Sequence, residues 1–327
     1  MNARIIGTGH YVPPFVLTNE GLESIVDTSD EWIFSHTGIK ERHICQSETV
    51  WEMALHAAER ALESAAISAE EIDIIIGSSV TQDYAFPPMS CIVQGKIGAK
   101  NAFCFDQAAA CSGFVFALET ARQYIENGRA KTVLVIASEM LSRVTDYTDR
   151  TTCVLFGDAA GAVVLRASDT CGIKSTYCMS DGSRGDLLVC KGIENKSPFA
   201  KPSNEITPDL KDQFIMMRGH DVYKFAVRIM QDAMVRVLDD AGVDASEIRW
   251  MVPHQANIRI IKSMADKFAL PMDKVYINLD RFGNTSSATI PTALDELNRA
   301  GKLRHGDKIV LIGFGGGLTC GAALIEW

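Results

Sequence analysis

The chain has 327 residues, 47% of them hydrophobic, and a formal net charge of −9. This length suits two domains or one duplicated domain with a substantial core, and the acidic balance argues against a general nucleic-acid binder. The start "MNARIIGTGHYVPP" lacks the apolar stretch of a signal peptide, and no run approaches the roughly 20 apolar residues of a transmembrane helix. We therefore expect a cytoplasmic protein without membrane segments.

Nine cysteines are scattered along the chain at irregular spacings, and none forms a C-x-x-C pair. The odd count and the missing pairs argue against a disulfide framework or a zinc site, so we expect no metal. The default interpretation of each cysteine is a small buried hydrophobic residue in a reducing compartment.

In chain order, the first half contains segments that return in the second half. "ALESAAISAEEIDIIIGSSVTQ" (61–82) resembles "VLDDAGVDASEIRWMVPHQAN" (237–257), and "KTVLVIASE" (131–139) resembles "KIVLIGFGG" (308–316). "GDAAGAVVLRA" (157–167) also resembles "GGLTCGAALIEW" (316–327). The separation between partners is nearly the same for the first two pairs, which indicates a duplication.

Each half predicts short β-branched strands covered by amphipathic helices, the latter at 49–66, 111–127, 220–241 and 287–300. We expect an α/β protein of layered α/β/α/β/α architecture, with an N-terminal half over 1–170 and a C-terminal half over 171–327. The polar segment 191–213 carries three prolines and predicts a flap near a site.

Three strand-to-helix connections carry the polar residues that point to chemistry. Cys111 follows the predicted strand "AFCFD", His254 lies in "PHQAN" after "RWMV", and Asn284 lies in "RFGNTSSATIP" after the predicted strand "KVYINL". Ligands of α/β layers bind at the carboxyl ends of strands. The duplication places Cys111 and Asn284 in corresponding connections, so we expect all three side chains to meet in one cleft.

These residue types suit acyl transfer. A cysteine at a helix start feels the positive end of the helix dipole, so we expect a lowered thiol pKa and a nucleophilic thiolate. His254 and Asn284 each supply an N–H donor, and two converging donors form an oxyanion hole. Structural interpretations stay open: Cys111 as a core residue, "HQAN" as an ordinary loop, and "GNTSS" as helix-capping sequence.

Two glycine runs, "IIGTGHYV" and "IGFGGGLTCG", resemble nucleotide-binding loops only superficially. Neither completes G-x-G-x-x-G or leads into a predicted helix, as that motif requires. "FGGG" lies between two predicted strands, where it indicates a tight turn and close backbone approach to a ligand. No G-x-S-x-G motif of a serine hydrolase is present.

Taken together and in order, "DQAAACSGF", "VPHQAN", "GNTSSATIP" and "GFGGGLTCGAAL" resemble the 3-oxoacyl-[acyl-carrier-protein] synthase III family. The resemblance runs nearly end to end, from "TSDEWI" and "TGIKERHI" to the last strand. It implies the thiolase fold, a homodimer, and no cofactor beyond the CoA and carrier-protein thioesters that serve as substrates. The implied reaction transfers an acyl group from acyl-CoA, acetyl-CoA above all, to a cysteine and then condenses it with malonyl-acyl carrier protein (malonyl-ACP).

The resemblance also assigns roles to the catalytic positions. Cys111 matches the nucleophile, and His254 and Asn284 match the pair that binds the malonyl thioester carbonyl. The backbone N–H groups of Cys111 and Gly316 match a second oxyanion hole, and Phe314 matches an aromatic residue near the departing carboxylate.

Substrate-binding positions follow from the same resemblance. Trp32 and Arg150 match the residues on either side of the CoA adenine, and Gly219 and Asn257 match contacts along the pantetheine arm. His36 is a departure, because an arginine is usual there beside the CoA phosphates.

Three further positions concern partners. Lys224 and Arg259 match a basic patch that docks the acidic carrier protein, and Phe86 matches a residue that closes the acyl pocket across the dimer. Tyr223 stands where phenylalanine is common.

The same residues exclude some related enzyme classes and leave others open. A biosynthetic thiolase needs a second cysteine where Phe314 stands, and a hydroxymethylglutaryl-CoA synthase needs a glutamate that "SSVTQD" lacks. A chalcone-type synthase, or a secondary-metabolism enzyme that condenses or transfers acyl groups from CoA esters, keeps the same three catalytic residues and stays open. A non-catalytic partner subunit is disfavoured because all three residues are present.

Overall fold

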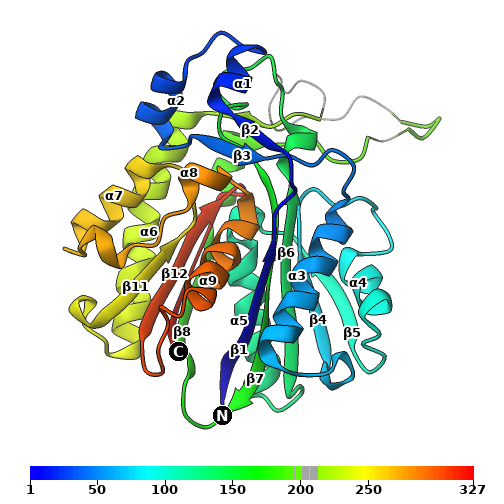
Figure 1. The fold of residues 1–327 in the computed structure, drawn as a ribbon, viewed down its shortest axis with the longest axis vertical. Helices are drawn as coiled ribbons and strands as arrows, with labels where there is room; N and C mark the ends of the chain where they lie inside the picture. The colour runs from blue at the N-terminus through cyan, green and yellow to red at the C-terminus, as the bar shows by residue number, and fades with distance from the viewer. Residues whose placement is uncertain (195, 201–205, 207–212) are drawn as a thin grey trace.

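The structure is a computed structural model that describes residues 1–194, 196–200, 206 and 213–327. Strands and helices alternate along the chain and build two main sheets that stand side by side, with helices on the faces of each (Figure 1). The flap predicted over 191–213 falls largely outside the described residues.

The first sheet has the strand order β1-β7-β6-β4-β5. Its members are β1 (Asn2–Tyr11), β4 (Ile74–Ser78), β5 (Phe103–Gln107), β6 (Thr132–Met140) and β7 (Asp158–Ser168). β4, β5 and β6 run parallel, whereas β7 is antiparallel to both β6 and β1. Every residue of β4 and β6 is buried, as expected for strands covered on both faces.

The second sheet repeats this plan in the order β11-β12-β13-β8. Its members are β8 (Gly172–Ser180), β11 (Ile248–Pro253), β12 (Lys308–Gly315) and β13 (Thr319–Glu326). β11 and β12 are parallel, and β13 is antiparallel to β12 and β8, so strand directions match those of β4, β6, β7 and β1.

The predicted strand "KVYINL" is wrong, since this segment makes only an isolated bridge between Val275 and Met251. The side chain of Gln255 takes the place of a neighbouring strand. Its Nε2 donates to the carbonyl of Tyr276 at 3.1 Å, and its Oε1 accepts from the N–H of Asn278 at 3.2 Å. The segment's backbone is therefore hydrogen-bonded without a strand ladder.

The helices complete five layers, as predicted. α3 (Val50–Ala65) and α4 (Met89–Ile97) cover the outer face of the first sheet. α5 (Gly113–Glu126) and α9 (Thr289–Arg299) lie between the sheets, where their apolar residues form one core with both (Figure 1). α6 (Gly219–Ala241) and α7 (Ile258–Lys267) cover the outer face of the second sheet.

The remaining elements are short. The helices are α1 (Asn19–Glu23), α2 (Asp30–Thr37) and α8 (Leu279–Phe282), and the strands form the pairs β2 (Val16–Thr18) with β3 (Glu41–His43) and β9 (Leu188–Val189) with β10 (Met216–Met217). Single turns of 3-10 helix are η1 (Ala69–Glu71), η2 (Ala110–Ser112), η3 (Leu141–Val144), η4 (Gly182–Leu187), η5 (Ala245–Glu247), η6 (Met272–Lys274) and η7 (Ser286–Ala288).

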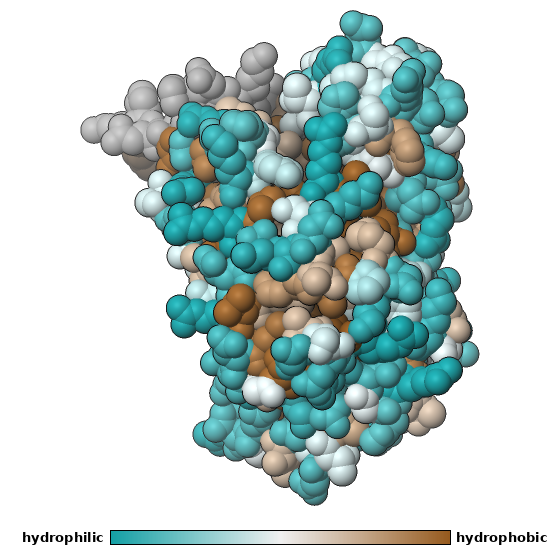
Figure 2. All heavy atoms as spheres, turned by 90° about the vertical axis from the view of Figure 1, so that its left-hand side faces the viewer, coloured by the Kyte–Doolittle hydropathy of each residue, from teal (hydrophilic) through white to brown (hydrophobic). Residues whose placement is uncertain are grey.

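Capping residues recur in the turn that joins helix to strand in each half. Ser68 and Glu71 form a reciprocal capping box before β4, and Asp244 and Glu247 form another before β11. The face at the left of Figure 1 is mainly hydrophilic, with apolar side chains gathered around its centre (Figure 2). None of the helices within the described residues is long and apolar enough to span a bilayer.

Candidate active site

Two cavities of about 630 and 420 Å³ meet at Cys111. The first is lined by most of the residues predicted to bind substrate or catalyse, namely Trp32, Cys111, Gly219, Lys224, His254, Asn257, Arg259, Asn284 and Phe314. The second extends to the other side of Cys111 and is lined there by Gly316 and apolar side chains. The three predicted catalytic residues therefore share one cleft, and the thiol lies at its junction with a second.

Cys111 lies in η2, directly before α5, and Asn284 lies directly before η7 and α9. These connections have the same backbone turn, because Ala110 and Ser286 stand at equivalent places with φ of 44° and 51°. Left-handed backbone is uncommon for residues other than glycine. Its recurrence at both places explains why the two connections bring their residues to the same cleft.

The glycine run at the end of β12 packs directly against the backbone of Cys111. A Cβ on Gly315 would lie 2.5 Å from the amide nitrogen of Cys111, whereas one on Gly316 would meet nothing closer than 3.4 Å. Close approach, rather than nucleotide binding, is thus the reason for glycine at 315.

A Gly315→Ala variant is expected to lose about 1–3 kcal/mol of stability through this clash and to acylate at least about tenfold more slowly. Thermal unfolding and single-turnover acylation measure the two effects. Gly316→Ala is the matched control, since it adds the same methyl group without a backbone clash. Equal losses in both variants would show that the close approach at 315 is unimportant.

The predicted lowering of the Cys111 pKa is wrong for the free site. Burial, together with the nearby charge of Glu139, raises the pKa of this thiol to about 12. A hydrogen bond with the Ser286 side chain acts in the opposite direction without reversing the shift. Loss of hydration opposes the charged form more than the helix start favours it, so the resting group is a thiol.

His254 follows β11 and is almost fully buried. Burial lowers its pKa to about 3, so the imidazole is neutral at physiological pH. Its Nδ1 lies 2.7 Å from Thr289 Oγ1, and the ring meets Phe314 edge to face at 5.5 Å between centroids. The Thr289 hydroxyl proton is donated to the carbonyl of Ser286 at 2.9 Å, so Nε2 carries the ring proton only when this hydroxyl turns from the carbonyl to Nδ1.

Asn284 is fixed from both sides. Its backbone N–H donates to Leu155 at 2.8 Å, and its Oδ1 accepts from the N–H of Ser286 at 2.9 Å. Because the amide oxygen is engaged in this way, Nδ2 is the group that can donate into the cavity. Asn284 therefore presents a donor in the same cleft as the His254 ring and the Cys111 thiol.

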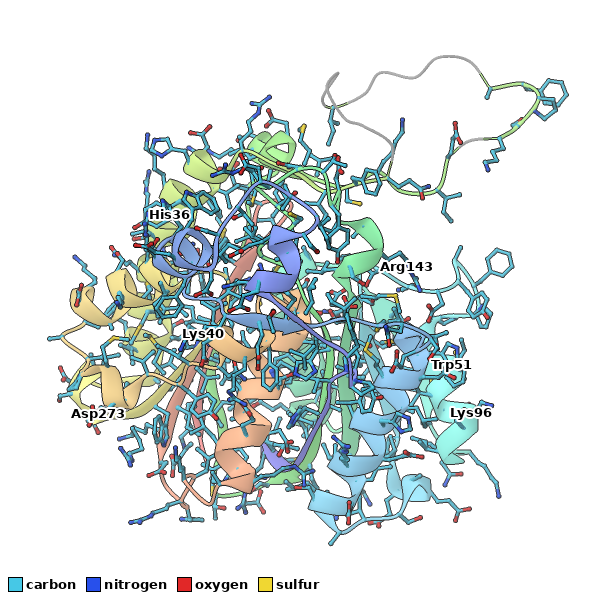
Figure 3. The ribbon with its side chains drawn as sticks, turned by 45° about the horizontal axis from the view of Figure 1, so that its top comes forward. His36, Lys40, Trp51, Lys96, Arg143 and Asp273 are labelled. Carbon is cyan, nitrogen blue, oxygen red and sulfur yellow. The ribbon has the colours of Figure 1, made fainter. Side chains whose placement is uncertain are left out.

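The outer end of the first cavity is formed by α2. The guanidinium of Arg150 lies 4.5 Å from the Trp32 ring, and the His36 ring stacks on Trp32 at 4.6 Å. The predicted adenine slot is thus not open, because direct contact leaves no space for a third planar group. Figure 3 shows His36 on this side of the molecule and Arg143, which lines the second cavity, on the other.

Polar and basic residues surround this outer end. Asn257 caps α7 through the N–H of Arg259 at 2.8 Å and donates to the carbonyl of His36 at 3.0 Å. Arg259 donates to the carbonyl of Ser35, and Lys224 lines the cavity beside Tyr223. Asn257 therefore both caps α7 and lines the cavity.

Phe86 is not brought to either cavity within one chain. Its side chain is 85% exposed, and it lies in the connection before α4, next to the edge of the first sheet.

Sequence reasoning missed three residues of the site: Glu139, Ser286 and Thr289. All three are buried, and each is hydrogen-bonded to a residue of the cleft or to one of the others. The signal that could have found Glu139 is an acid at the end of the otherwise apolar strand "TVLVIASEM". Among the described residues, no group of three or more His, Cys, Asp or Glu side chains is arranged to hold a metal ion.

Comparisons with known proteins agree with this architecture. Models of the 3-oxoacyl-[acyl-carrier-protein] synthase III family match residues 105–182, and those of its C-terminal part match residues 238–327. The crystal structure of the synthase III from Aquifex aeolicus superposes with a TM-score of 0.92 at 45% identity, covering 99% of this chain and 100% of the other. A priming β-ketosynthase of the R1128 polyketide pathway superposes equally well, at 35% identity over 99% and 96% of the two chains.

Fold and similarity define the protein as an acyltransferase with the thiolase fold, which confirms the predicted fold and enzyme class. The β-ketoacyl-[acyl-carrier-protein] synthase III of Clostridium acetobutylicum is 50% identical over all of this chain and 99% of the relative. That of Xanthomonas axonopodis is 45% identical over 99% and 98%. The chain belongs to the 3-oxoacyl-[acyl-carrier-protein] synthase III family.

Proposed function

We propose that the chain joins an acyl-CoA primer, acetyl-CoA above all, to malonyl-ACP and releases CoA, CO₂ and a 3-oxoacyl-ACP. This is the initiating condensation of type II fatty-acid synthesis. The observation that carries the proposal is the meeting of Cys111, His254 and Asn284 in one cavity of a chain that belongs to this family. The proposed reaction uses thioester substrates and requires neither a metal nor another cofactor.

In the first stage, the sulfur of Cys111 attacks the acyl-CoA carbonyl carbon. The carbon–sulfur bond to CoA breaks, CoA leaves as a thiol, and the acyl group stays on Cys111 as a thioester. The backbone N–H groups of Cys111 and Gly316 are proposed to stabilise the developing oxyanion. The apolar wall of the second cavity, which includes Leu141 and Phe156, supports a site for the acyl chain there.

In the second stage, malonyl-ACP loses CO₂, and the electrons of the broken bond form an enolate. His254 and Asn284 are proposed to donate to the thioester oxygen where this negative charge gathers. Phe314 supplies an apolar wall beside His254. Such a wall disfavours the charged malonyl carboxylate and so favours its loss as neutral CO₂. The enolate carbon then attacks the acyl-Cys111 carbonyl, and the cysteine sulfur leaves and takes up a proton.

Substrate binding is proposed along the first cavity. The CoA adenine would bind beside Trp32 after Arg150 moves off that ring, and the pantetheine arm would pass Gly219 and Asn257. Lys224 and Arg259 lie at the same opening, where two cations suit an acidic carrier protein as partner.

The active assembly is proposed to be a homodimer. β5 is an edge strand of the first sheet. An edge strand presents backbone N–H and C=O groups along its free side, where a strand of a second copy can pair. Phe103 on β5 is 52% exposed, and Phe86 stands nearby with still greater exposure. In the proposed dimer, Phe86 would close the partner's acyl pocket.

The two halves, 1–170 and 171–327, are proposed to be structural repeats that meet at the site. Cys111 comes from the first half, and His254 and Asn284 come from the second. A cytoplasmic location is part of the same proposal, because both thioester substrates are intracellular metabolites.

A primer panel tests this function. Acyl-CoA esters from acetyl to octanoyl are supplied with malonyl-ACP or malonyl-CoA, and the condensation products are measured. We expect the highest kcat/KM with acetyl-CoA and a strong preference for malonyl-ACP. A preference for malonyl-CoA would favour a secondary-metabolism enzyme. A maximum of kcat/KM at a longer acyl-CoA would show that the primer is that acyl group and not acetyl.

A further inference from the structure

Glu139, the penultimate residue of β6, carries a fully buried carboxyl group behind the active site. Every donor that contacts it is neutral. Its Oε2 accepts from the Thr81 hydroxyl at 2.8 Å, and from Val80 N–H and Ser79 Oγ at 3.1 and 3.3 Å. Its Oε1 accepts from the hydroxyls of two serines of η7. Five donors and no donated bond describe an ionised carboxylate.

The two serines differ in what else they touch. Ser286 Oγ lies 3.1 Å from Glu139 Oε1, and Ser286 lines the second cavity together with Cys111. Ser287 Oγ lies 2.8 Å from the same carboxylate oxygen. Since the single Ser286 hydroxyl proton points to Glu139, its oxygen is free to accept from the thiol. The Ser286 hydroxyl therefore offers a proton path between the Cys111 thiol and the Glu139 carboxylate.

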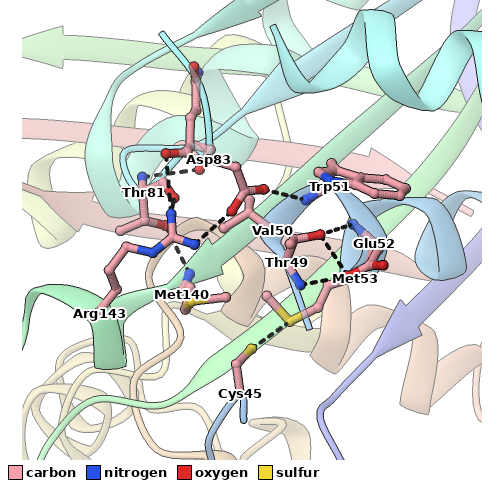
Figure 4. A network of polar contacts seen from close by, with 12 residues as sticks. Cys45, Thr49, Val50, Trp51, Glu52, Met53, Thr81, Asp83, Met140 and Arg143 are labelled. Atoms are coloured by element: carbon pink, nitrogen blue, oxygen red, sulfur yellow. Dashed lines mark hydrogen bonds and ion pairs between the residues drawn. The ribbon is translucent and has the colours of Figure 1, made fainter. Parts of the chain in front are cut away.

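The carboxylate side of this chain is held rigidly. Thr81 Oγ1 accepts from the N–H of Met140 at 2.8 Å, and the carbonyl of Thr81 accepts from the guanidinium of Arg143 at 3.0 Å (Figure 4). Arg143 is itself paired with Asp83, whose other oxygen accepts from the N–H of Trp51. These bonds fix the loop that follows β4 and keep Thr81 beside Glu139.

We propose that Glu139 is the acceptor of the Cys111 proton and that Ser286 carries the proton between them. The thiol proton passes to Ser286 Oγ while the hydroxyl proton of Ser286 passes to Glu139 Oε1. A thiolate and a neutral carboxyl group result. When the carbon–sulfur bond to CoA breaks, Glu139 returns its proton to Ser286 Oγ, and the Ser286 hydroxyl gives its own proton to the thiolate sulfur of departing CoA. Ser286 is then a catalytic residue, and Glu139 acts through it as a positioning residue.

Burial supports this pairing, because it raises the pKa of both groups and so favours one proton shared between them. The transfer moves a charge from one buried atom to another and brings no net charge into the site. His254 suits the task less, since burial lowers its pKa to about 3 and its Nδ1 is engaged by Thr289.

The test is the pH dependence of Cys111 alkylation by iodoacetamide, followed by peptide-resolved mass spectrometry. A shared proton makes the thiolate fraction constant between the two apparent pKa values of the pair. We expect the wild-type rate constant to change less than about threefold from pH 6.5 to 8.5. In Glu139→Gln it should rise about tenfold per pH unit, because the thiol then titrates alone.

Other ionisable groups around the thiol are His254 in the first cavity, and Arg143, Cys190 and Lys191 in the second. All are retained in the variants, so their influence on the pH profile is the same in each. A merely structural role of Glu139 would lower the rate constant by one factor at every pH and leave the profile flat.

Two serine variants make the comparison specific. Both Ser286→Ala and Ser287→Ala remove one hydroxyl from Glu139 Oε1, but only the first interrupts the path to sulfur. Alanine tolerates the left-handed backbone of position 286, as Ala110 shows at the equivalent place. We expect the flat profile to be lost in Ser286→Ala and kept in Ser287→Ala. A flat profile in Ser286→Ala, or its loss in both, would overturn the proposal even if Glu139→Gln fails to fold.

The role in acyl transfer rests on the proposed function, whereas alkylation needs no acyl substrate. Single-turnover acylation by acetyl-CoA over the same pH range is the second measurement. A relay seen in alkylation without acylation by any acyl-CoA would contradict the proposed function alone. Normal acylation with a steep wild-type alkylation profile would contradict the relay alone.

Discussion

A Cys111→Ala variant is expected to lose covalent acylation and to keep part of the malonyl decarboxylation. The thiol is the proposed nucleophile, so its removal should lower the rate of condensation by at least about 10⁴-fold. Decarboxylation depends instead on the donors of His254 and Asn284, which lie in the same cavity and do not bond to the thiol. Radiolabelled acyl-CoA and intact-protein mass measure acylation, and CO₂ release measures the second activity.

Cys190→Ala is the control, because Cys190 lines the second cavity and is an exposed thiol. It should acylate like the wild type. Radiolabel that persists in Cys111→Ala and disappears in Cys190→Ala would show that the nucleophile is Cys190 and not Cys111. Complete loss of decarboxylation in Cys111→Ala, with an unchanged melting temperature, would show that the two stages are not separable in the proposed way.

The layered fold was predictable because its elements have strong local patterns. Helix α3 has a capping box and an amphipathic repeat, and β4 and β6 are short apolar runs. The strand prediction for the segment after α7 was wrong. "KVYINL" has the composition of a strand, but its backbone is hydrogen-bonded to the side chain of Gln255. A long-range contact of this kind leaves no periodic trace in sequence.

The meeting of the catalytic residues was predictable from the duplication, since equivalent loops end at equivalent places. The thiol pKa was not, because it depends on burial that only the packed site defines. Glu139 was overlooked for a related reason. An acid inside an apolar strand indicates a hydrogen-bonded network, but its five donors come from two loops far apart in the chain.

His254 provides the second large expected effect. Replacing it with alanine removes one of two proposed donors to the enolate oxygen, so decarboxylation should slow by about 10²–10³-fold. Acylation should change less than about threefold, because the proposed path of the thiol proton avoids the imidazole. CO₂ release and single-turnover acylation are measured on the same preparation. Equal losses in both stages would instead support a general-base role for His254.

The low pKa of His254 adds a test in pH. The folded imidazole titrates near 3, whereas an unfolded one titrates near 6.5, so the unfolded state binds more protons between these values. Relative to His254→Ala, the wild type should therefore lose stability as pH falls below about 6.5, by at most about 1.4 kcal/mol per pH unit. Above pH 7 the difference should be constant, and wild-type decarboxylation should show no step near 6.5. Such a step would indicate an imidazole that becomes charged during turnover, and the neutral donor would then be the wrong form.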